Sequence, residues 1–116
     1  MTGEFHRLDR VIHERARLAI MSLLAAGRTM TFIELRERLD MTDGNLSRHL
    51  AVLQDHGLVL CEKHTGEGRP TTEVSLTDEG RRGFARYIES LEAILAPARD
   101  RETGSVTDDE EALSPA

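Results

Sequence analysis

The sequence predicts a mainly α-helical domain that carries one small β-hairpin. Two observations favour this fold class. Apolar residues recur at helical spacing over residues 8–26, 31–39, 43–56 and 77–96, and the spacing changes to two between residues 58 and 76. With 116 residues, of which 39% are hydrophobic, the chain is long enough for one domain with a modest core.

The first predicted helix spans residues 8–26. A break near His13 is possible, and Gly27 suits the C-terminal cap of this helix. Arg15 and Arg17 lie largely off the apolar stripe, so we expect both side chains to be solvated, with a subunit contact as the alternative.

Two shorter helices follow, joined by a tight turn. Thr31 and Glu34 form a capping box that predicts the start of helix 31–39, and Thr42 is expected to cap helix 43–56. The third helix turns its leucines towards the core and a polar side outwards. Two helices joined in this way are typical of a helix-turn-helix, which places its second helix in a DNA groove.

The rest of the folded part is predicted to be a hairpin and one long helix. Residues 58–64 and 71–76 alternate as strands, and residues 65–70 form the loop between them. Thr77 is expected to cap the last helix, and Pro97 is expected to end it.

The charge is distributed unevenly along the chain. The net charge is −6, and from Pro97 onward two arginines face six acidic residues, which leaves −2 for the body. We therefore divide the chain into a flexible arm at residues 1–7, a folded domain at 8–96 and an acidic, disordered tail at 97–116. Because DNA-binding domains are usually basic, any DNA contact here must depend on geometry more than on bulk charge.

The order of elements over residues 8–95 resembles the winged helix-turn-helix regulators of the MarR and ArsR type. Three stretches carry the resemblance: RLAIMSLL at 17–24, LSRHLAVL at 46–53 with GLV at 57–59, and GRP at 68–70 with LTDEGR at 76–81. The resemblance implies a three-helical core, a wing at the hairpin and a long C-terminal dimerisation helix. It also implies a homodimeric regulator of transcription, which we expect to be a repressor, bound to double-stranded DNA.

Seven residues are predicted to contact DNA, with helix 43–56 in the major groove and loop 65–70 at the minor groove. They are Thr42, Gly44, Asn45, Ser47, Arg48, Lys63 and Arg69.

Each of these residues also has a structural explanation that the sequence leaves open. Thr42 can cap its helix and donate to a phosphate, and Gly44 either permits close approach of a backbone or is there by chance. Asn45 can pair with adenine or remain a solvated amide, and Arg48 can contact guanine or a phosphate. Arg69, beside a proline at the hairpin tip, suits a minor groove.

The last helix is predicted to form the dimer interface, because its apolar stripe is longer than a small core requires. The stripe consists of Phe84, Tyr87, Ile88, Leu91, Ile94 and Leu95. The alternative is that Phe84 and Ile88 only close the core of one protomer.

Other functions find less support in the sequence. The metal-sensing members of the resembled families carry cysteine, histidine or acidic ligands in the helix that corresponds to 31–39 or in the last helix. This chain has neither cysteine nor histidine in those two helices, so we expect no metal and no cofactor.

No acid–base constellation suggests an enzyme. Whether a small-molecule effector exists stays open. The rival explanation is a winged helix that binds proteins and not DNA, which the acidic charge favours.

The single cysteine bears on the cellular compartment. As the single cysteine, Cys61 cannot form an internal disulfide. The sequence also shows no secretory signal and no apolar run of membrane-spanning length. These observations favour a cytoplasmic location and no membrane contact. We expect Cys61 to be a small buried hydrophobic residue, with a redox-sensing thiol as the alternative.

Overall fold

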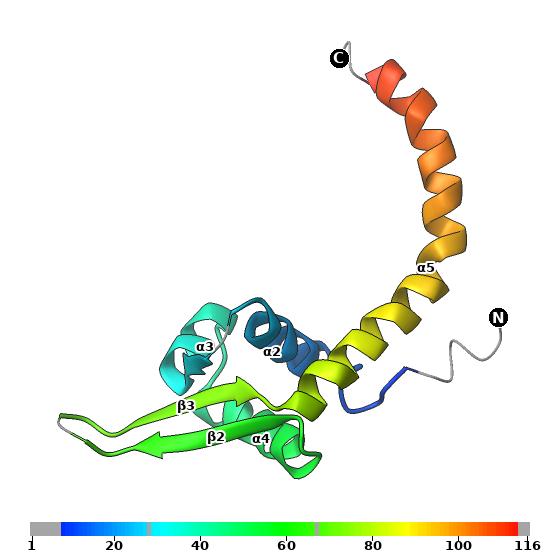
Figure 1. The fold of residues 1–116 in the computed structure, drawn as a ribbon. Coiled ribbons are helices and arrows are strands. Elements are labelled where there is room, and N and C mark those ends of the chain that lie inside the picture. Colours follow the sequence, from blue (N-terminus) through cyan, green and yellow to red (C-terminus); the bar gives the residue numbers. More distant parts are fainter. Residues whose placement is uncertain (1–7, 28, 67, 114–116) are drawn as a thin grey trace.

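The computed structural model describes residues 8–27, 29–66 and 68–113, of which 102–113 are described as backbone only. The predicted arm at residues 1–7 lies outside the described residues. The elements in chain order are α2 (Arg15–Ala26), β1 (Thr29–Thr31), α3 (Phe32–Leu39), α4 (Asp43–Asp55), β2 (Val59–His64), β3 (Thr71–Leu76) and α5 (Asp78–Leu113). Three short helices and a small sheet form the body, and α5 extends away from it (Figure 1).

The predicted fold class is confirmed, with one strand more than the hairpin. The three strands are antiparallel in the order β1-β3-β2, so β3 lies in the middle. Met30 of β1 and Cys61 of β2 both face Val74 of β3 in the register. Strand β1 is only three residues long, and its two threonines are β-branched residues that suit extended backbone.

The predicted helix starts are confirmed in atomic detail. The Thr31 hydroxyl accepts the Glu34 N–H at 3.1 Å while the Glu34 carboxylate accepts the Thr31 N–H at 2.9 Å, which completes the capping box of α3. Thr42 accepts the Asn45 N–H at 3.1 Å at the start of α4. Asp40 closes α3 in the left-handed region (φ 53°), which makes the turn between the two helices tight.

The first helix is shorter than the apolar stripe suggested. Residues 8–14 form a turn, and α2 begins only at Arg15, whose predecessor Glu14 caps the helix by accepting the Arg17 N–H at 2.8 Å. The possible break near His13 is therefore where the structure places the boundary. Gly27 caps the other end, and its N–H donates to the Leu23 carbonyl.

One hydrophobic core holds these elements together. Burying one large apolar side chain stabilises a fold by roughly 1.5–3 kcal/mol. The buried members are Ile12, Ile20, Met21, Leu24, Leu35, Leu46, Leu50, Leu53, Leu58, Val59, Val74, Leu76, Phe84 and Tyr87.

The start of α5 is fixed against the beginning of β2. The Thr77 hydroxyl donates to the Gly57 carbonyl at 2.6 Å and accepts the Gly80 N–H at 2.9 Å, which confirms Thr77 as the cap. The Thr77 N–H donates to the Leu58 carbonyl at 3.1 Å. A Cβ added at Gly80 would lie 2.0 Å from that same carbonyl oxygen, so α5 crosses this point in contact with the backbone.

The predicted end of the last helix at Pro97 is wrong. Helix α5 continues through Pro97 to Leu113 and curves along its length (Figure 1). A proline inside a helix removes one backbone hydrogen bond and bends the helix, but it need not end it. Residues 97–113, predicted to be a disordered tail, are therefore helical in the structure, and residues 114–116 lie outside the described part.

Candidate nucleic-acid interface

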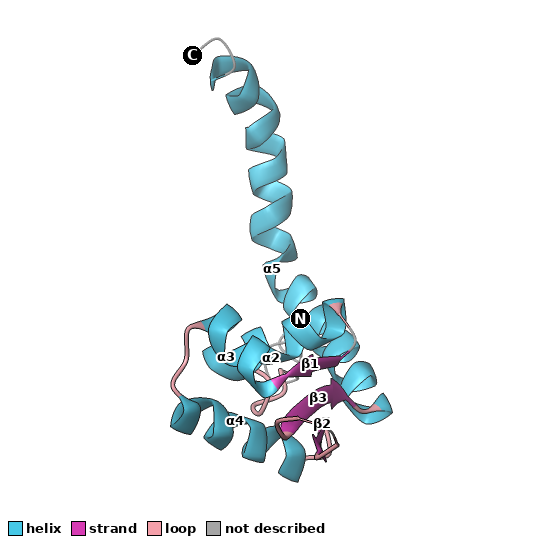
Figure 2. Cartoon of the chain, turned by 90° about the vertical axis from the view of Figure 1, so that its left-hand side faces the viewer, coloured by secondary structure: helices cyan, strands magenta, loops and turns pink. Residues whose placement is uncertain are grey.

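The side of α4 that faces away from the core presents the predicted DNA-contacting residues together. Leu46, Leu50 and Leu53 are buried on the inner side. The predicted residues Thr42, Gly44, Asn45, Ser47 and Arg48 are all exposed. Asn45 and Arg48 line one hollow, and Ser47 lines another on the opposite flank of α4. Figure 2 shows α4 and β2 at the end of the molecule opposite to the far end of α5.

Thr42 can serve as cap and phosphate contact at the same time. Its oxygen accepts the Asn45 N–H, which leaves the hydroxyl hydrogen free to donate outwards. The N-terminal end of a helix also favours an anion because its N–H groups point towards it.

The exposed glycine of α4 has no structural role within the protomer. A Cβ added at Gly44 would have nothing within 4 Å, and the residue lies in the first turn of α4. Since nothing in the fold requires a glycine here, an external backbone is the remaining physical reason for it besides chance.

Helix α4 is linked to α3 by an ion pair across the turn. Nη1 of Arg36 lies 2.8 Å from Oδ1 of Asp43, the first residue of α4. The bond with Asp43 raises the pKa of the Arg36 guanidinium above its usual value. Both side chains are partly solvated, so this pair restrains the angle between the helices more than it stabilises the fold.

The wing consists of β2, β3 and the loop between them, and its two predicted basic residues are both exposed. Lys63 lies opposite Thr72 in the ladder, and Arg69 follows Gly68, which adopts a positive φ of 84° at the tip. His64 pairs with Glu73 across the strands at 3.1 Å. Glu67 of the same loop lies outside the described residues.

A polar hollow of about 590 Å³ separates the start of α2 from the start of α4. Thr42, Asn45 and Arg48 line one side of it, and Glu14 and Arg15 line the other. No local pattern in the sequence indicates that α2 lies next to the predicted DNA-contacting side of α4.

The expectation of a solvated Arg17 is wrong, whereas Arg15 is exposed as expected. Arg17 is half-buried: its Nε donates to the Val11 carbonyl at 2.6 Å, and its Nη1 lies 3.2 Å from Nδ1 of His49 in α4. Spacing within one helix could not reveal this contact, because its partner is 32 residues away in the chain.

The six residues predicted for the dimer interface separate into two groups. Phe84 and Tyr87 are buried in the protomer's own core, and their rings stack with centroids 6.2 Å apart. Oη of Tyr87 lies 2.7 Å from Nδ1 of His13, and burial raises the pKa of the Tyr87 hydroxyl. These two residues therefore have little surface for a second subunit.

The other four members of the stripe extend towards the surface. Ile88 is 38% exposed and Leu95 51% exposed, and Leu91 and Ile94 are half-buried. Leu91 packs against the core from its margin. An apolar strip of α5 is thus left uncovered beyond the body of the protomer.

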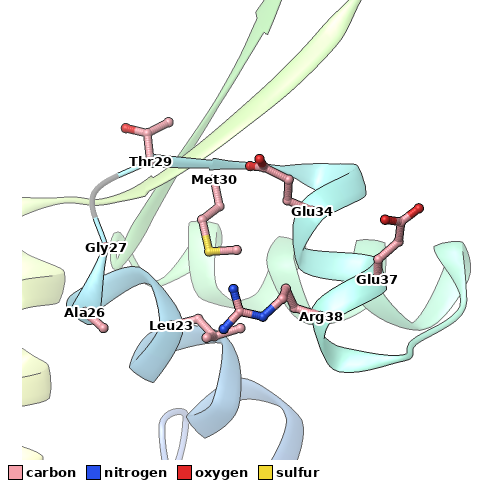
Figure 3. Close-up of a pocket in the computed structure, with 8 residues that line it drawn as sticks. All are labelled: Leu23, Ala26, Gly27, Thr29, Met30, Glu34, Glu37 and Arg38. Atoms are coloured by element: carbon pink, nitrogen blue, oxygen red, sulfur yellow. The ribbon is translucent and has the colours of Figure 1, made fainter.

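A second hollow, of about 630 Å³, lies between the end of α2, β1 and α3. The Arg38 side chain crosses it towards Leu23 and Met30, while Glu37 points away (Figure 3). Its floor is apolar. None of the residues predicted to contact DNA lines it.

Cys61 on β2 packs against the core but is only half-buried, less than the buried position expected of it. Burial raises the pKa of its thiol, which disfavours the reactive thiolate. Within the described ranges no three His, Cys, Asp or Glu side chains are arranged to hold a metal ion. No described helix is long and apolar enough to cross a membrane.

Comparison with known proteins gives consistent matches. Residues 16–95 match a family described as winged helix DNA-binding domain. An uncharacterized protein of Methanocaldococcus jannaschii is 35% identical over 79 residues, which cover 68% of this chain and 86% of that protein. A solved structure of a transcriptional regulator homologue from Pyrococcus horikoshii is 34% identical with a TM-score of 0.75, over 78% of this chain and 89% of the other.

Two more distant structures agree in fold. HlyU from Vibrio cholerae is 26% identical with a TM-score of 0.57, over 75% of this chain and 86% of its own. YusO from Bacillus subtilis is 22% identical with a TM-score of 0.70, over 87% of this chain and 74% of its own. The resemblance to winged helix-turn-helix regulators is therefore confirmed.

Proposed function

The chain belongs to the winged helix DNA-binding domain family and is a DNA-binding regulator, and from this premise we propose how it binds. Helix α4 enters the major groove, the wing lies at the adjacent minor groove, and two protomers bind a short palindrome as a homodimer. The observation that supports this most is the exposed polar side of α4, directly opposite its buried leucines.

Base contacts are assigned to the side chains that extend furthest from that side of α4. Arg48 can donate two parallel hydrogen bonds to guanine, and Asn45 can pair with adenine through its amide. Thr42 and Ser47 donate to phosphates, which fixes the position of the helix but carries no sequence information. Gly44 lets the DNA backbone approach the first turn.

The wing supplies a second contact about one groove away. Arg69, exposed at the tip beside Pro70, inserts into the minor groove, and Lys63 contacts the flanking phosphate. The His64–Glu73 pair neutralises one acidic group near this site when the imidazole is protonated.

A dimer is proposed because one recognition helix contacts only a few base pairs. A two-fold pair binds half-sites about 34 Å apart, which matches one turn of DNA. The exposed strip of α5, Ile88 and Leu95 with the half-buried Leu91 and Ile94, is the proposed subunit contact. Repression follows if the bound palindrome overlaps a promoter. A cytoplasmic location is part of the same proposal.

Salt titration of DNA binding tests the interface. The logarithm of affinity for a random duplex should fall linearly with the logarithm of salt concentration. Lys63→Ala should reduce the magnitude of that slope by about one, because Lys63 is the proposed phosphate contact of the wing. Arg48→Ala should weaken binding to a selected duplex by roughly 1–3 kcal/mol. Arg82→Ala removes an exposed cation of α5 and serves as the control, with both quantities unchanged.

The same titration separates DNA binding from the rival function. A slope near zero for the unmodified chain would favour a winged helix that binds proteins, since the body carries a net charge of −2. If Arg48→Ala and Arg69→Ala both left binding unchanged while the slope stayed steep, the chain would bind DNA through another surface.

A further inference from the structure

Three side chains connect α4 to α2 beside the polar hollow, and the proposed function has not used them. Nη1 of Arg17 lies 3.2 Å from Nδ1 of His49, and Oε1 of Glu14 lies 3.8 Å from the same nitrogen. We propose that Arg17 and His49 are positioning residues for base contact by α4, and that protonation of His49 transfers it from Arg17 to Glu14. The inference rests on the proposed function, because it assigns a role within DNA binding.

The chemistry of the contact fixes the state of the imidazole. A guanidinium has only donors, so Nδ1 of His49 must be the acceptor at 3.2 Å. This hydrogen bond requires the tautomer that carries its hydrogen on Nε2. Protonation puts a hydrogen on Nδ1, which removes the acceptor and sets two positive groups against each other.

Glu14 is placed to receive the protonated imidazole. Its carboxylate caps α2 by accepting the Arg17 N–H at 2.8 Å, and this hydrogen bond is the main reason why the pKa of Glu14 is lowered. Glu14 therefore stays ionised over the range in which histidines titrate. An approach of less than 1 Å from the present separation of 3.8 Å would make a charge-assisted hydrogen bond.

The charged groups around His49 all belong to the three elements that meet at the hollow. Glu14 and Arg15 line the hollow at the start of α2, Asp40 lines it from the turn after α3, and Arg48 lines it from α4. Arg17 contacts His49 from α2. The His49 side chain is only 13% exposed, so it cannot release the added charge into water without moving. Either a shift of the side chain or a shift of α4 must follow.

Such a shift reaches the residues proposed to contact bases. Arg48 precedes His49 in the chain and Asn45 lies one turn earlier, and all three line the same hollow. Because base contacts require hydrogen bonds of defined length and direction, a small displacement of α4 weakens discrimination between sequences more than it weakens attraction to phosphates.

The experiment measures that discrimination as a function of pH. A duplex selected from a random pool and a scrambled duplex of the same composition are titrated at constant ionic strength between pH 8 and pH 5.5. The ratio of the two affinities should fall by about fivefold towards pH 5.5, which is the loss expected from one hydrogen bond. A ratio is used because added positive charge raises affinity for any DNA.

Two variants separate the positioning role from other titrating groups. In His49→Gln the amide oxygen can still accept from Arg17 but does not titrate, so the ratio should be independent of pH. In Glu14→Gln the imidazolium loses its partner, so the fall should move to lower pH. His56→Gln, at the end of the same helix, is a control that should keep the fall unchanged.

An NMR measurement on the free protein decides the contact without DNA. At pH 8 the ¹⁵N shifts should show His49 as the tautomer with its hydrogen on Nε2; a hydrogen on Nδ1 would overturn the proposal. The proposal would also be overturned if the ratio of the two affinities did not change with pH in the unmodified chain, or if its fall persisted in His49→Gln. If the pool yields no preferred duplex, the proposed function fails instead, and the tautomer still tests the Arg17–His49 contact.

Discussion

Among the glycines of the described ranges, Gly80 is the one where an added Cβ would clash with backbone. The start of α5 lies so close to the residue before β2 that this Cβ would be 2.0 Å from the Leu58 carbonyl oxygen. The position of a Cβ is fixed by its own backbone, and the carbonyl is backbone, so neither can rotate away. The sequence contained Gly80 within LTDEGR, but nothing local distinguished it from a glycine in a solvated first turn.

We therefore expect Gly80→Ala to lower the free energy of unfolding by about 3 kcal/mol or more, at the upper end of overpacking effects. Urea denaturation followed by circular dichroism measures the change. An unaltered urea concentration at the midpoint of unfolding would show that α5 can move away from Leu58 at little cost in free energy.

Gly44, unlike Gly80, has room for a side chain. Since a Cβ there meets nothing, Gly44→Ala should leave the fold intact and stabilise it by up to about 1 kcal/mol through higher helix propensity. Binding to a selected duplex should nevertheless weaken, because the methyl group would lie between α4 and the DNA backbone. Stabilisation without any loss of binding would mean that the glycine is there by chance.

Among the secondary structure elements, those defined by contacts between near neighbours could be predicted from the sequence. The caps at Thr31, Thr42 and Thr77 depend on hydrogen bonds that span three residues, and all three are confirmed. The leucine stripe of α4 follows equally from local spacing. The DNA-contacting role of its outer side stays a prediction, because no local pattern identifies a ligand.

The features that the sequence missed all depend on distant partners. Strand β1 exists because Thr29, Met30 and Thr31 pair with residues 73–75, and three residues carry too little pattern to reveal this. The contact of Arg17 with His49 and the burial of Tyr87 against His13 are equally non-local. Such contacts become visible only when the chain is folded.

Helix α5 beyond Pro97 can be tested as an element of its own. Leu91 is the last described residue that packs against the core, so a chain ended after Ala96 should keep its midpoint of thermal unfolding within about 2–4 °C, less than 1 kcal/mol for a domain of this size. The difference between the circular dichroism spectra of the two chains reports how helical residues 97–113 are in solution. A large loss of stability would place part of the core beyond residue 96.

At the scale of the whole molecule, the proposed DNA contacts lie on the body, and the proposed subunit contact lies on α5 where this helix leaves the body (Figure 1). This arrangement lets each be altered without the other. The molecule measures 59 × 39 × 22 Å, and α5 accounts for much of the longest dimension (Figure 1).

Leu95→Glu should convert the dimer into a monomer, because Leu95 is 51% exposed and a carboxylate cannot be buried against a second apolar strip without cost. Light scattering after size-exclusion chromatography measures the mass. Glu89→Gln alters an exposed charge of the same helix and should leave the mass of a dimer. Binding to a palindrome should weaken in Leu95→Glu, while the slope of log affinity against log salt concentration, counted per protomer, should persist. If the unmodified chain were monomeric, there would be no basis for this contact.

The pairing of β1 with β3 has a topological consequence. The backbone between Thr29 and Ser75 forms a closed loop, fastened where these two strands meet, and the whole of α3, α4 and the wing lies inside it. Closing a loop of this length has an entropic cost that rises only slowly with further residues, so insertions at the wing tip disturb the closure little. The pairing of β1 with β3 that closes the loop is only three residues long. A chain that opens there would lose the backbone pairing of β1 with β3, whereas the shared hydrophobic core would still hold the helices against each other.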